Sequence, residues 1–277
     1  MAYRDILVAL TSYPDPTPVS AVEDAVSVAA TLGAHLAAIS CETRVQLPGH
    51  FVSAPMVSGV IAGEAGKSRK NAQQLLAAFD AAAGKAGILH ETILEKCLTL
   101  EVPDILVEYA RLRDLTILPV PASSDQWYAE AIIFGSGKPT LILPESPNPR
   151  PFKLDIVALA WDFSRAAARA VADALPMLER AKQVRIVTVV NEKALDTRRS
   201  AEEVAKNLAR HGIDVVLDRI DAGGLSIGAV LESYTSSQGA DLLVMGAYGH
   251  TRLREFVLGG ATRSLLAQPP LPILFSH

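Results

Sequence analysis

The sequence contains the same order of predicted strands and helices twice, and this repetition restricts the chain to few folds. In each half, short apolar runs typical of buried strands alternate with amphipathic segments typical of helices, in the order β-α-β-α-β-α-β-α-β. Three pairs of segments match between the halves: DILVAL with DIVALA, DLTILPV with DLLVMGA, and KPTLILP with LPILFSH. Strands that alternate with helices predict an α/β fold with parallel sheets, because parallel neighbours need a crossover connection.

We therefore expect two tandem doubly wound domains, each with a five-stranded parallel sheet, over residues 1–146 and 153–277. The chain has 277 residues, of which 49% are hydrophobic, so it can form two cores. The segment ESPNPRPFK, residues 145–153, contains three prolines and is predicted to be an extended linker. The last strand of each half is a candidate pairing edge, used either within one chain or between two chains.

Composition argues against several classes of partner. The net charge is -4 and no block of like charge occurs, so a nucleic-acid-binding surface is not expected. No apolar stretch approaches the roughly 18 residues of a membrane span, and the start of the chain does not resemble a signal peptide. The two cysteines, Cys41 and Cys97, form no CxxC motif and are expected to be reduced thiols. These features predict a cytoplasmic protein without a membrane partner.

The strongest functional signal is VMGAYGHTRLREFVLGGATRSLL, residues 244–266, which follows the fourth predicted strand of the second half. Ligands of doubly wound sheets bind beyond the carboxyl ends of the strands, where the strand order reverses. Glycines at this place let backbone N–H groups approach a phosphate, and the start of the next helix favours an anion. The segment also carries basic side chains, and Arg263 follows in the helix. We predict an anion or nucleotide site, the alternative being a flexible turn with solvated arginines.

The spacing Gly246-x2-Gly249-x9-Gly259 resembles the G-x2-G-x9-G-(S/T) signature of the universal stress protein family. The resemblance covers nearly the whole chain as two copies of an adenine nucleotide alpha hydrolase-like fold, packed as a pseudo-dimer. It implies that the loop binds the phosphates and ribose of ATP, with Mg²⁺ as an accompanying ion. It also implies that an aspartate after the first strand contacts adenine, and that backbone after the second strand lines the adenine pocket.

The resemblance assigns specific residues to this site. Asp162 matches the adenine-contacting aspartate, although it could instead cap the next helix, for which Ser164 competes. Gly260 stands where the family has Ser or Thr, which leaves Thr262 as the hydroxyl that can contact a phosphate. The nucleotide-binding residues that the resemblance implies are Asp162, Val190, Met245, Gly246, Gly249, His250, Arg252, Gly259, Gly260, Ala261 and Thr262.

The first half lacks these features. Pro119 and Pro121 stand in the region of the first two glycines and remove N–H donors. The first predicted strand is followed by TSYPD, which has no aspartate at the matching point. We expect this half to be degenerate for ATP and to pack against the second half. Whether the segment 44–70 is packed loop or a lid over another ligand is left open.

Catalysis is not the expected function. No GxSxG, HExxH or Walker A motif occurs, and the histidines outside the loop have no metal-ligand spacing. His250 lies in the glycine loop, where the simpler interpretation is a surface histidine. The sequence favours a protein that binds an adenine nucleotide, and whose nucleotide state changes its interaction with an unidentified protein in stress response or signalling. The alternatives are a scaffold or chaperone-like protein that uses no nucleotide and a slow ATPase, and a homodimer is compatible with each.

Overall fold

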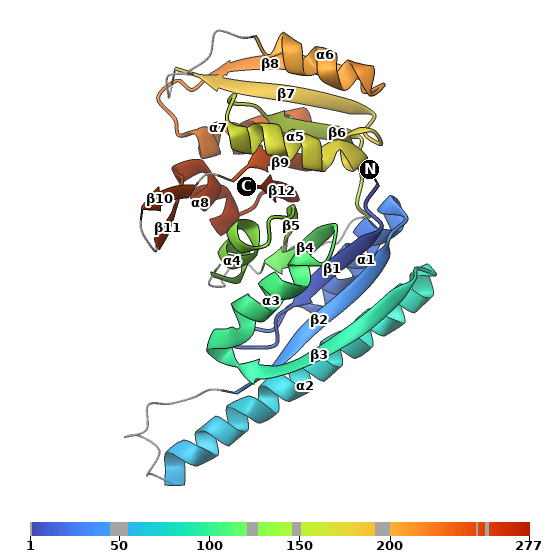
Figure 1. Cartoon of the computed structure of the whole chain (residues 1–277), viewed down its shortest axis with the longest axis vertical. Helices are drawn as coiled ribbons and strands as arrows, with labels where there is room; N and C mark the ends of the chain where they lie inside the picture. Colours follow the sequence, from blue (N-terminus) through green and yellow to red (C-terminus); the bar gives the residue numbers. More distant parts are fainter. Residues whose placement is uncertain are drawn as a thin grey trace. The chain divides into compact units, whose positions relative to one another are not determined.

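The computed structural model describes residues 2–44, 55–120, 127–145, 151–191, 200–247, 249–252 and 255–277. Within these residues the chain forms two compact units, and each is treated separately below. The first unit contains residues 3–136, and the second contains residues 152–277 together with residues 137–144. Both units are α/β structures in which parallel strands alternate with helices, as the sequence predicts (Figure 1).

The first unit has four strands in the order β3-β2-β1-β4, and each neighbouring pair is parallel. Strands β1 and β4 are almost completely buried, which explains their continuous apolar runs. Its strands and α-helices are β1 (Asp5–Leu10), α1 (Val19–Leu32), β2 (His35–Arg44), α2 (Pro55–Ala86), β3 (His90–Leu98), α3 (Val102–Arg111), β4 (Leu115–Val120) and α4 (Trp127–Gly135).

The second unit has five parallel strands in the order β8-β7-β6-β9-β12, with β5 added at the β12 edge. Helix α5 packs on β9 and β12, and α7 packs on α8. The elements of this sheet and its helices are β5 (Thr140–Pro144), β6 (Ile156–Ala160), α5 (Arg165–Leu178), β7 (Gln183–Val190), α6 (Glu202–Arg210), β8 (Val215–Asp221), α7 (Ile227–Gln238), β9 (Leu242–Gly246), α8 (Gly260–Ala267) and β12 (Ile273–Ser276).

Strand β5 follows β4 in the order of the sheet, as expected for the fifth strand of the first half. It also pairs antiparallel with β12, and these two strands belong to the same compact unit. The register places Ile142 opposite Ile273 and Thr140 opposite Phe275. The last strands of the two sequence halves therefore pair with each other within one chain.

Two helices differ from their predicted extents. Helix α2 was expected over residues 64–86 but begins at Pro55, so much of the segment 44–70 is helical. Its first turns extend beyond the strands of the first unit (Figure 1). Pro176 was expected to kink or end its helix early, and α5 does end two residues later, at Leu178. A proline this close to the end removes only one N–H from the hydrogen-bond ladder.

One aspartate in each unit joins two neighbouring strands at their amino ends. Asp114 Oδ2 accepts hydrogen bonds from the backbone N–H groups of Arg4 and Asp5, at 2.8 and 3.1 Å. Asp241 Oδ2 accepts from those of Asp155 and Ile156, at 2.9 and 3.0 Å. The same contact in both units is direct structural support for an internal duplication, and we call it the aspartate bridge.

Strand register shows which residues of the two units are equivalent to each other. Ile6 lies opposite Leu115 in the first unit, and Val157 lies opposite Leu242 in the second. Asp5 is therefore equivalent to Ile156, one residue beyond the position that the match of DILVAL with DIVALA suggests. Apolar strands offer little to distinguish neighbouring registers by sequence, whereas the aspartate bridge fixes the register through two hydrogen bonds.

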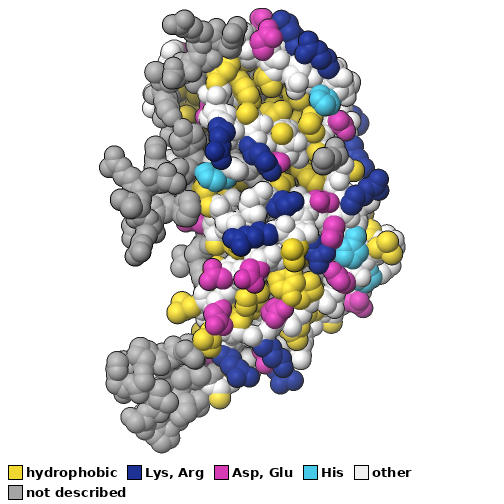
Figure 2. Space-filling view, viewed as in Figure 1, with side chains coloured by type: hydrophobic (Ala, Val, Ile, Leu, Met, Phe, Trp, Pro, Cys, Tyr) yellow, Lys and Arg dark blue, Asp and Glu magenta, His cyan; other side chains and the backbone are white. Residues whose placement is uncertain are grey.

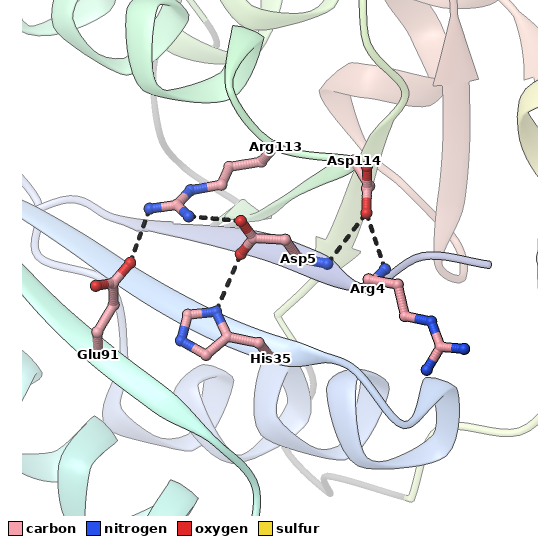
Figure 3. Close-up of polar contacts among 6 residues, drawn as sticks. All are labelled: Arg4, Asp5, His35, Glu91, Arg113 and Asp114. Carbon is pink, nitrogen blue, oxygen red and sulfur yellow. Dashed lines mark hydrogen bonds and ion pairs between the residues drawn. The ribbon is translucent and has the colours of Figure 1, made fainter. Parts of the chain in front are cut away.

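Charged side chains extend the aspartate bridge of the first unit (Figure 3). Arg113 Nη1 lies 2.6 Å from Asp5 Oδ2, and its Nη2 lies 2.8 Å from Glu91 Oε1. His35 Nδ1 lies 3.0 Å from Asp5 Oδ1. Burial raises the pKa of Asp5, but the hydrogen bonds from Arg113 and His35 outweigh it, so this pKa lies below its usual value. The cluster connects the amino ends of four neighbouring strands.

Replacing Asp241 with alanine should destabilise the second unit by about 2 kcal/mol, because two backbone N–H groups lose a charged acceptor. Urea unfolding measures the change in the free energy of unfolding. Glu232→Ala on the exposed side of α7 is the control and should change that free energy by less than about 0.5 kcal/mol. Equal stabilities for the two variants would show that the aspartate bridge does not hold the strands together.

The Asp5 cluster should make the free energy of unfolding depend on pH in the acidic range. A carboxylate whose folded-state pKa is lowered stabilises the fold fully above its unfolded pKa of about 4, and this stabilisation is lost as the pH falls through the lower folded pKa. The difference in unfolding free energy between the parent and Asp5→Asn should therefore be largest near neutral pH and shrink below about pH 4. Glu108→Gln, at an exposed position of α3, is the control. A difference that is constant with pH would contradict the assignment.

Candidate functional site

The strand order of the second unit reverses between β6 and β9. The chain leaves β6 toward β7 on one side, and it leaves β9 toward β12 on the other. The connections after these two strands diverge, and the region beyond their carboxyl ends, called the crevice below, is the usual ligand position in doubly wound sheets. The sequence-predicted residues Asp162, Val190 and Gly246 lie at the ends of β6, β7 and β9, and are brought to this edge by the topology.

Asp162 is exposed and begins the turn between β6 and α5. Its Oδ1 accepts a hydrogen bond from the backbone N–H of Ser164 at 3.0 Å. The helix cap is Ser164, whose hydroxyl oxygen accepts from the N–H of Ala167 at 3.0 Å. Of the two alternatives for capping, Ser164 is thus the one observed, and the Asp162 carboxylate is held in place rather than used as the cap.

The residues on either side of Asp162 form a constrained aromatic corner. Phe163 has a φ of 64°, a left-handed conformation that is unusual for a bulky residue. Its ring meets that of Trp161 edge-on, with centroids 5.6 Å apart, so Trp161 packs against a neighbouring ring. Trp161 Nε1 is buried without a hydrogen-bond partner among the described residues, and so is Thr188 Oγ1 on the adjacent strand. Strained backbone and unsatisfied polar atoms of this kind concentrate at functional sites.

The end of β7 supplies backbone groups to the same edge. The Val190 carbonyl oxygen accepts from the N–H of Ala222, so it is directed toward the β8 side. Asn191 follows with a φ of 65°, and its amide donates to Asp221 at 2.5 Å. The Gly223 N–H and the Asn191 amide lower the pKa of Asp221. These bonds join the carboxyl ends of β7 and β8.

Val189 is the residue of β7 whose carbonyl faces the crevice. Trp161 N–H donates to the Val187 carbonyl, so residue 187 is directed toward β6. Backbone groups of alternate residues point to the same neighbouring strand, so Val189 is also directed to that side. Beyond Trp161 the first strand has ended, and the chain turns away at Phe163. The carbonyl of Val190, the residue predicted from the sequence, is directed to the β8 side instead.

Gly246 is required by packing. A Cβ at this position would lie 2.5 Å from the carbonyl carbon of Ala166 and 2.6 Å from the backbone nitrogen of Ala167. The first turn of α5 therefore lies directly against the end of β9, and only glycine fits between them. The sequence analysis interpreted this glycine as a place for close approach of a phosphate, but the close approach observed here is by a helix. Met245 beside it is buried in the sheet.

The segment after β9 forms a β-hairpin. Strands β10 (Gly249–Arg252) and β11 (Glu255–Leu258) pair antiparallel, with Gly249 opposite Leu258. The sequence predicted only a loop here, because a short basic and polar stretch has no clear strand periodicity. The side chains of His250 and Arg252 lie outside the part of the chain that the structure describes, as does Arg254.

Helix α8 begins immediately after the hairpin. Gly259 is its N-cap, with φ of -62° and ψ of 149°, and provides no side chain to cap the helix. The first hydrogen bond of the helix runs from the Arg263 N–H to the Gly259 carbonyl at 2.9 Å. The preceding N–H groups point out of the helix end, as in every α-helix. A Cβ on Gly260 would have no atom within 4 Å, so the space beside Gly260 is open.

Thr262 and Ala261 lie in a more closely packed environment than Gly260. Thr262 is only 1% exposed, so its side chain is not directed to solvent as the sequence analysis expected for a phosphate contact. A Cβ on Gly228 of α7 would lie 2.2 Å from Ser264 Oγ and 3.7 Å from the Ala261 Cα, so the two helices pack closely. The small residue at position 228 permits this packing.

Further observations concern the described residues outside the crevice. Acidic and basic side chains both occur on the face of the described residues that Figure 2 shows. In the part of the chain that the structure describes, no three His, Cys, Asp or Glu side chains are placed to hold a metal ion. No helix among the described residues has the length and apolar character to cross a membrane. Pro119 lies within β4 of the first unit, whereas Pro121 lies outside the described residues.

Comparison with known proteins agrees with the geometry. Residues 153–277 match the model of the Universal stress protein family. No curated protein matches the sequence significantly.

Two solved structures resemble the whole chain. A universal stress protein from Archaeoglobus fulgidus DSM 4304 has a TM-score of 0.70 at 14% identity, over 98% of this chain and 97% of that chain. A proposed universal stress protein from Pseudomonas aeruginosa UCBPP-PA14 has a TM-score of 0.61 at 17% identity, over 99% and 93%. At these identities the likeness concerns the fold, and it extends over both units.

Two glycine variants test which glycine of this site is required by close packing and which one borders open space. Gly246→Ala should destabilise the protein by about 1–3 kcal/mol, because its Cβ overlaps the α5 backbone. Gly260→Ala should leave stability equal or slightly higher, because alanine favours a helix and meets no atom. Thermal unfolding of both variants measures the difference. A Gly246→Ala protein as stable as the parent would show that α5 does not lie against β9 as described.

Proposed function

We propose that the chain is a universal stress protein that binds ATP, or another adenine nucleotide, in its second unit. The observation that carries the proposal is the arrangement at the switch point of the sheet. A carboxylate held in place after β6, the backbone at the end of β7 and the start of α8 after β9 belong to a domain that matches the family. The base would lie near Asp162 and Val189, and the phosphates near the start of α8.

The described residues fit such a ligand. The N–H groups of Gly260 and Ala261 belong to the first turn of α8, where the helix dipole also favours an anion. Gly260 leaves open space beside this turn, and Arg263 adds a positive charge. We assign the phosphate contact to this backbone rather than to the buried Thr262 hydroxyl. Gly249, His250 and Arg252 of β10 complete the proposed phosphate side, and a nucleotide bound there would carry Mg²⁺ as counter-ion.

The nucleotide acts as a signal in this proposal, with at most weak hydrolysis. Residues 246–259 connect β9 to α8 and include the β10–β11 hairpin. Phosphates bound at the start of α8 would contact this hairpin and favour one of its conformations. A protein partner that recognises the hairpin would then distinguish the nucleotide-bound chain from the free chain. We place this activity in stress response or signalling in the cytoplasm, with the chain acting alone or as a homodimer.

A second candidate function is a scaffold that uses no nucleotide. Two observations favour it, because Gly246 and Thr262 are both accounted for by packing, without any ligand. Under this alternative the glycine-rich segment serves only to bring α5 and α8 close to the sheet. The two candidates differ in whether Asp162 and Gly249, which have no such packing role among the described contacts, matter for binding.

Variants at these two positions test the proposal. Asp162→Ala should weaken ATP binding about 10- to 100-fold, because a charged hydrogen-bond acceptor is lost, while the Ser164 cap keeps α5 intact. Gly249→Val should weaken it further, because its side chain blocks the approach of the phosphates. Isothermal titration calorimetry with Mg-ATP measures both affinities.

The control for this test is Glu232→Ala, an exposed change on α7. It should bind ATP as the parent does. If the parent binds ATP and all three variants bind equally well with intact folds, the nucleotide lies elsewhere. If the parent binds none, the scaffold function is favoured.

A further inference from the structure

The first unit has its own version of the crevice, and strand register locates it residue by residue. Asp5 pairs with His35 in the first unit, and Ile156 pairs with Gln183 in the second. Continuing along the paired strands makes Cys41 equivalent to Val189 and Thr43 equivalent to Asn191. The position equivalent to Asp162 is Thr11. The backbone that would meet a base in the second unit is therefore Cys41–Thr43 in the first.

This backbone is already hydrogen-bonded in the first unit. The Cys41 carbonyl accepts a hydrogen bond from the Ser12 hydroxyl, and Ser68 Oγ lies 3.5 Å from the same oxygen. Ser68 Oγ also accepts from the Thr43 backbone N–H at 2.9 Å. It lies 2.9 Å from Ser12 Oγ and 3.0 Å from Thr43 Oγ1. One hydroxyl group thus contacts both the acceptor and the donor of this backbone edge.

Ser68 belongs to α2, the helix that is longer than the sequence indicates. Its side chain is completely buried, and Ser12 and Thr43 are 3% exposed. Asn71, one turn later, donates its amide to the Ser12 carbonyl at 3.1 Å, so α2 is attached to the end of β1 at two points. Ala72, Leu75 and Phe79 continue the buried side of the helix against the unit. The contact is therefore the polar end of an extensive apolar interface.

We propose that α2 is an internal occupant of the base position of the first unit, and that Ser68 takes the hydrogen bonds that a base would otherwise make. The inference rests on the proposed function of the second unit, because that function defines which backbone edge is the base position. A base presents a donor and an acceptor on one edge, and a single hydroxyl can supply both. The first unit is closed to nucleotides by its own chain, in addition to lacking the glycine loop.

The second unit differs in its described contacts at the equivalent positions. There the residue equivalent to Thr11 is the exposed Asp162, and Val189 has no hydrogen bond to a hydroxyl among the described contacts. The turn after β1 is also closed in the first unit, since Thr11 N–H donates to Thr17 Oγ1 at 2.9 Å and Thr17 N–H donates to the Thr11 carbonyl at 2.9 Å. Equivalent backbone is thus hydrogen-bonded to hydroxyl groups in the first unit, whereas no such bond is described in the second.

Hydrogen–deuterium exchange on the full chain tests the inference, without ligand, with Mg-ATP and with adenosine. Peptides that cover Cys41–Arg44 and the segment 68–76 report on the first unit, and peptides that cover 186–190 and 259–266 report on the second. We expect the first-unit peptides to be strongly protected without ligand and to be unchanged by either compound. Slower exchange at Cys41–Arg44 on addition of ATP or adenosine would overturn the inference, because it would show an accessible site.

A variant pair tests the role of Ser68 directly. Ser68→Ala should speed exchange of the Thr43 amide about tenfold, since that N–H loses its acceptor. Lys70→Ala, at an exposed position of the same helix, should leave it unchanged. Equal exchange in the two variants would also overturn the inference. If Ser68→Ala does not fold, the comparison of exchange in the parent with and without ligand still tests the inference.

Exchange in different peptides tests the two proposals, so the failure of one can be distinguished from the failure of the other. Unchanged exchange at 186–190 and 259–266 with Mg-ATP would count against nucleotide binding by the second unit. Strong, ligand-independent protection at Cys41–Arg44 would still hold for the first unit.

Discussion

The aspartate bridge is the contact on which the arrangement of each unit depends. In both units one carboxylate accepts hydrogen bonds from two backbone N–H groups at the start of the neighbouring strand. These bonds fix the register of β1 with β4 and of β6 with β9. These strand pairs flank the switch point, so their register decides which residues emerge together at the opposite edge. Asp162 and Gly246 stand at that edge because Asp241 holds the other end of the same two strands.

From this shared frame the two units have diverged at their carboxyl ends. In the second, α5 is brought against β9 by a glycine, and the chain then extends into the β10–β11 hairpin before α8 begins. In the first, the long helix α2 brings Ser68 onto the end of β2. Polar backbone at a strand end must be satisfied by protein, water or ligand. The chain satisfies it internally in one unit, and we propose that a nucleotide satisfies it in the other.

Much of this could be predicted from the sequence, and the failures have physical causes. Strands such as β1 and β9 were predictable because both faces are buried and their runs are continuously apolar. The antiparallel pairing of β5 with β12 was left open, because an edge strand has the same sequence pattern whether it pairs within one chain or between two chains. The shift of one residue between the halves arose because DILVAL and DIVALA match well by composition, while the register depends on a distant aspartate.

The sequence predicted that Asp162 follows the strand β6 and that a helix begins after β9, and the structure has both elements. It missed that Gly246 is needed for helix packing and that Thr262 is buried, since both depend on which helix lies opposite. It also missed Ser68, because a serine within a predicted helix carries no signal for a contact with a strand end. The spacing of Ser68 to Asn71 and Ala72 could have indicated a buried polar face.

The central claim is that one unit is open to a nucleotide and the other is closed. Titration of the purified, nucleotide-free protein with Mg-ATP, with the stoichiometry as readout, tests it most directly. The account predicts one equivalent of ATP per chain. Two equivalents would contradict the closed first unit, and no binding would contradict the open second unit.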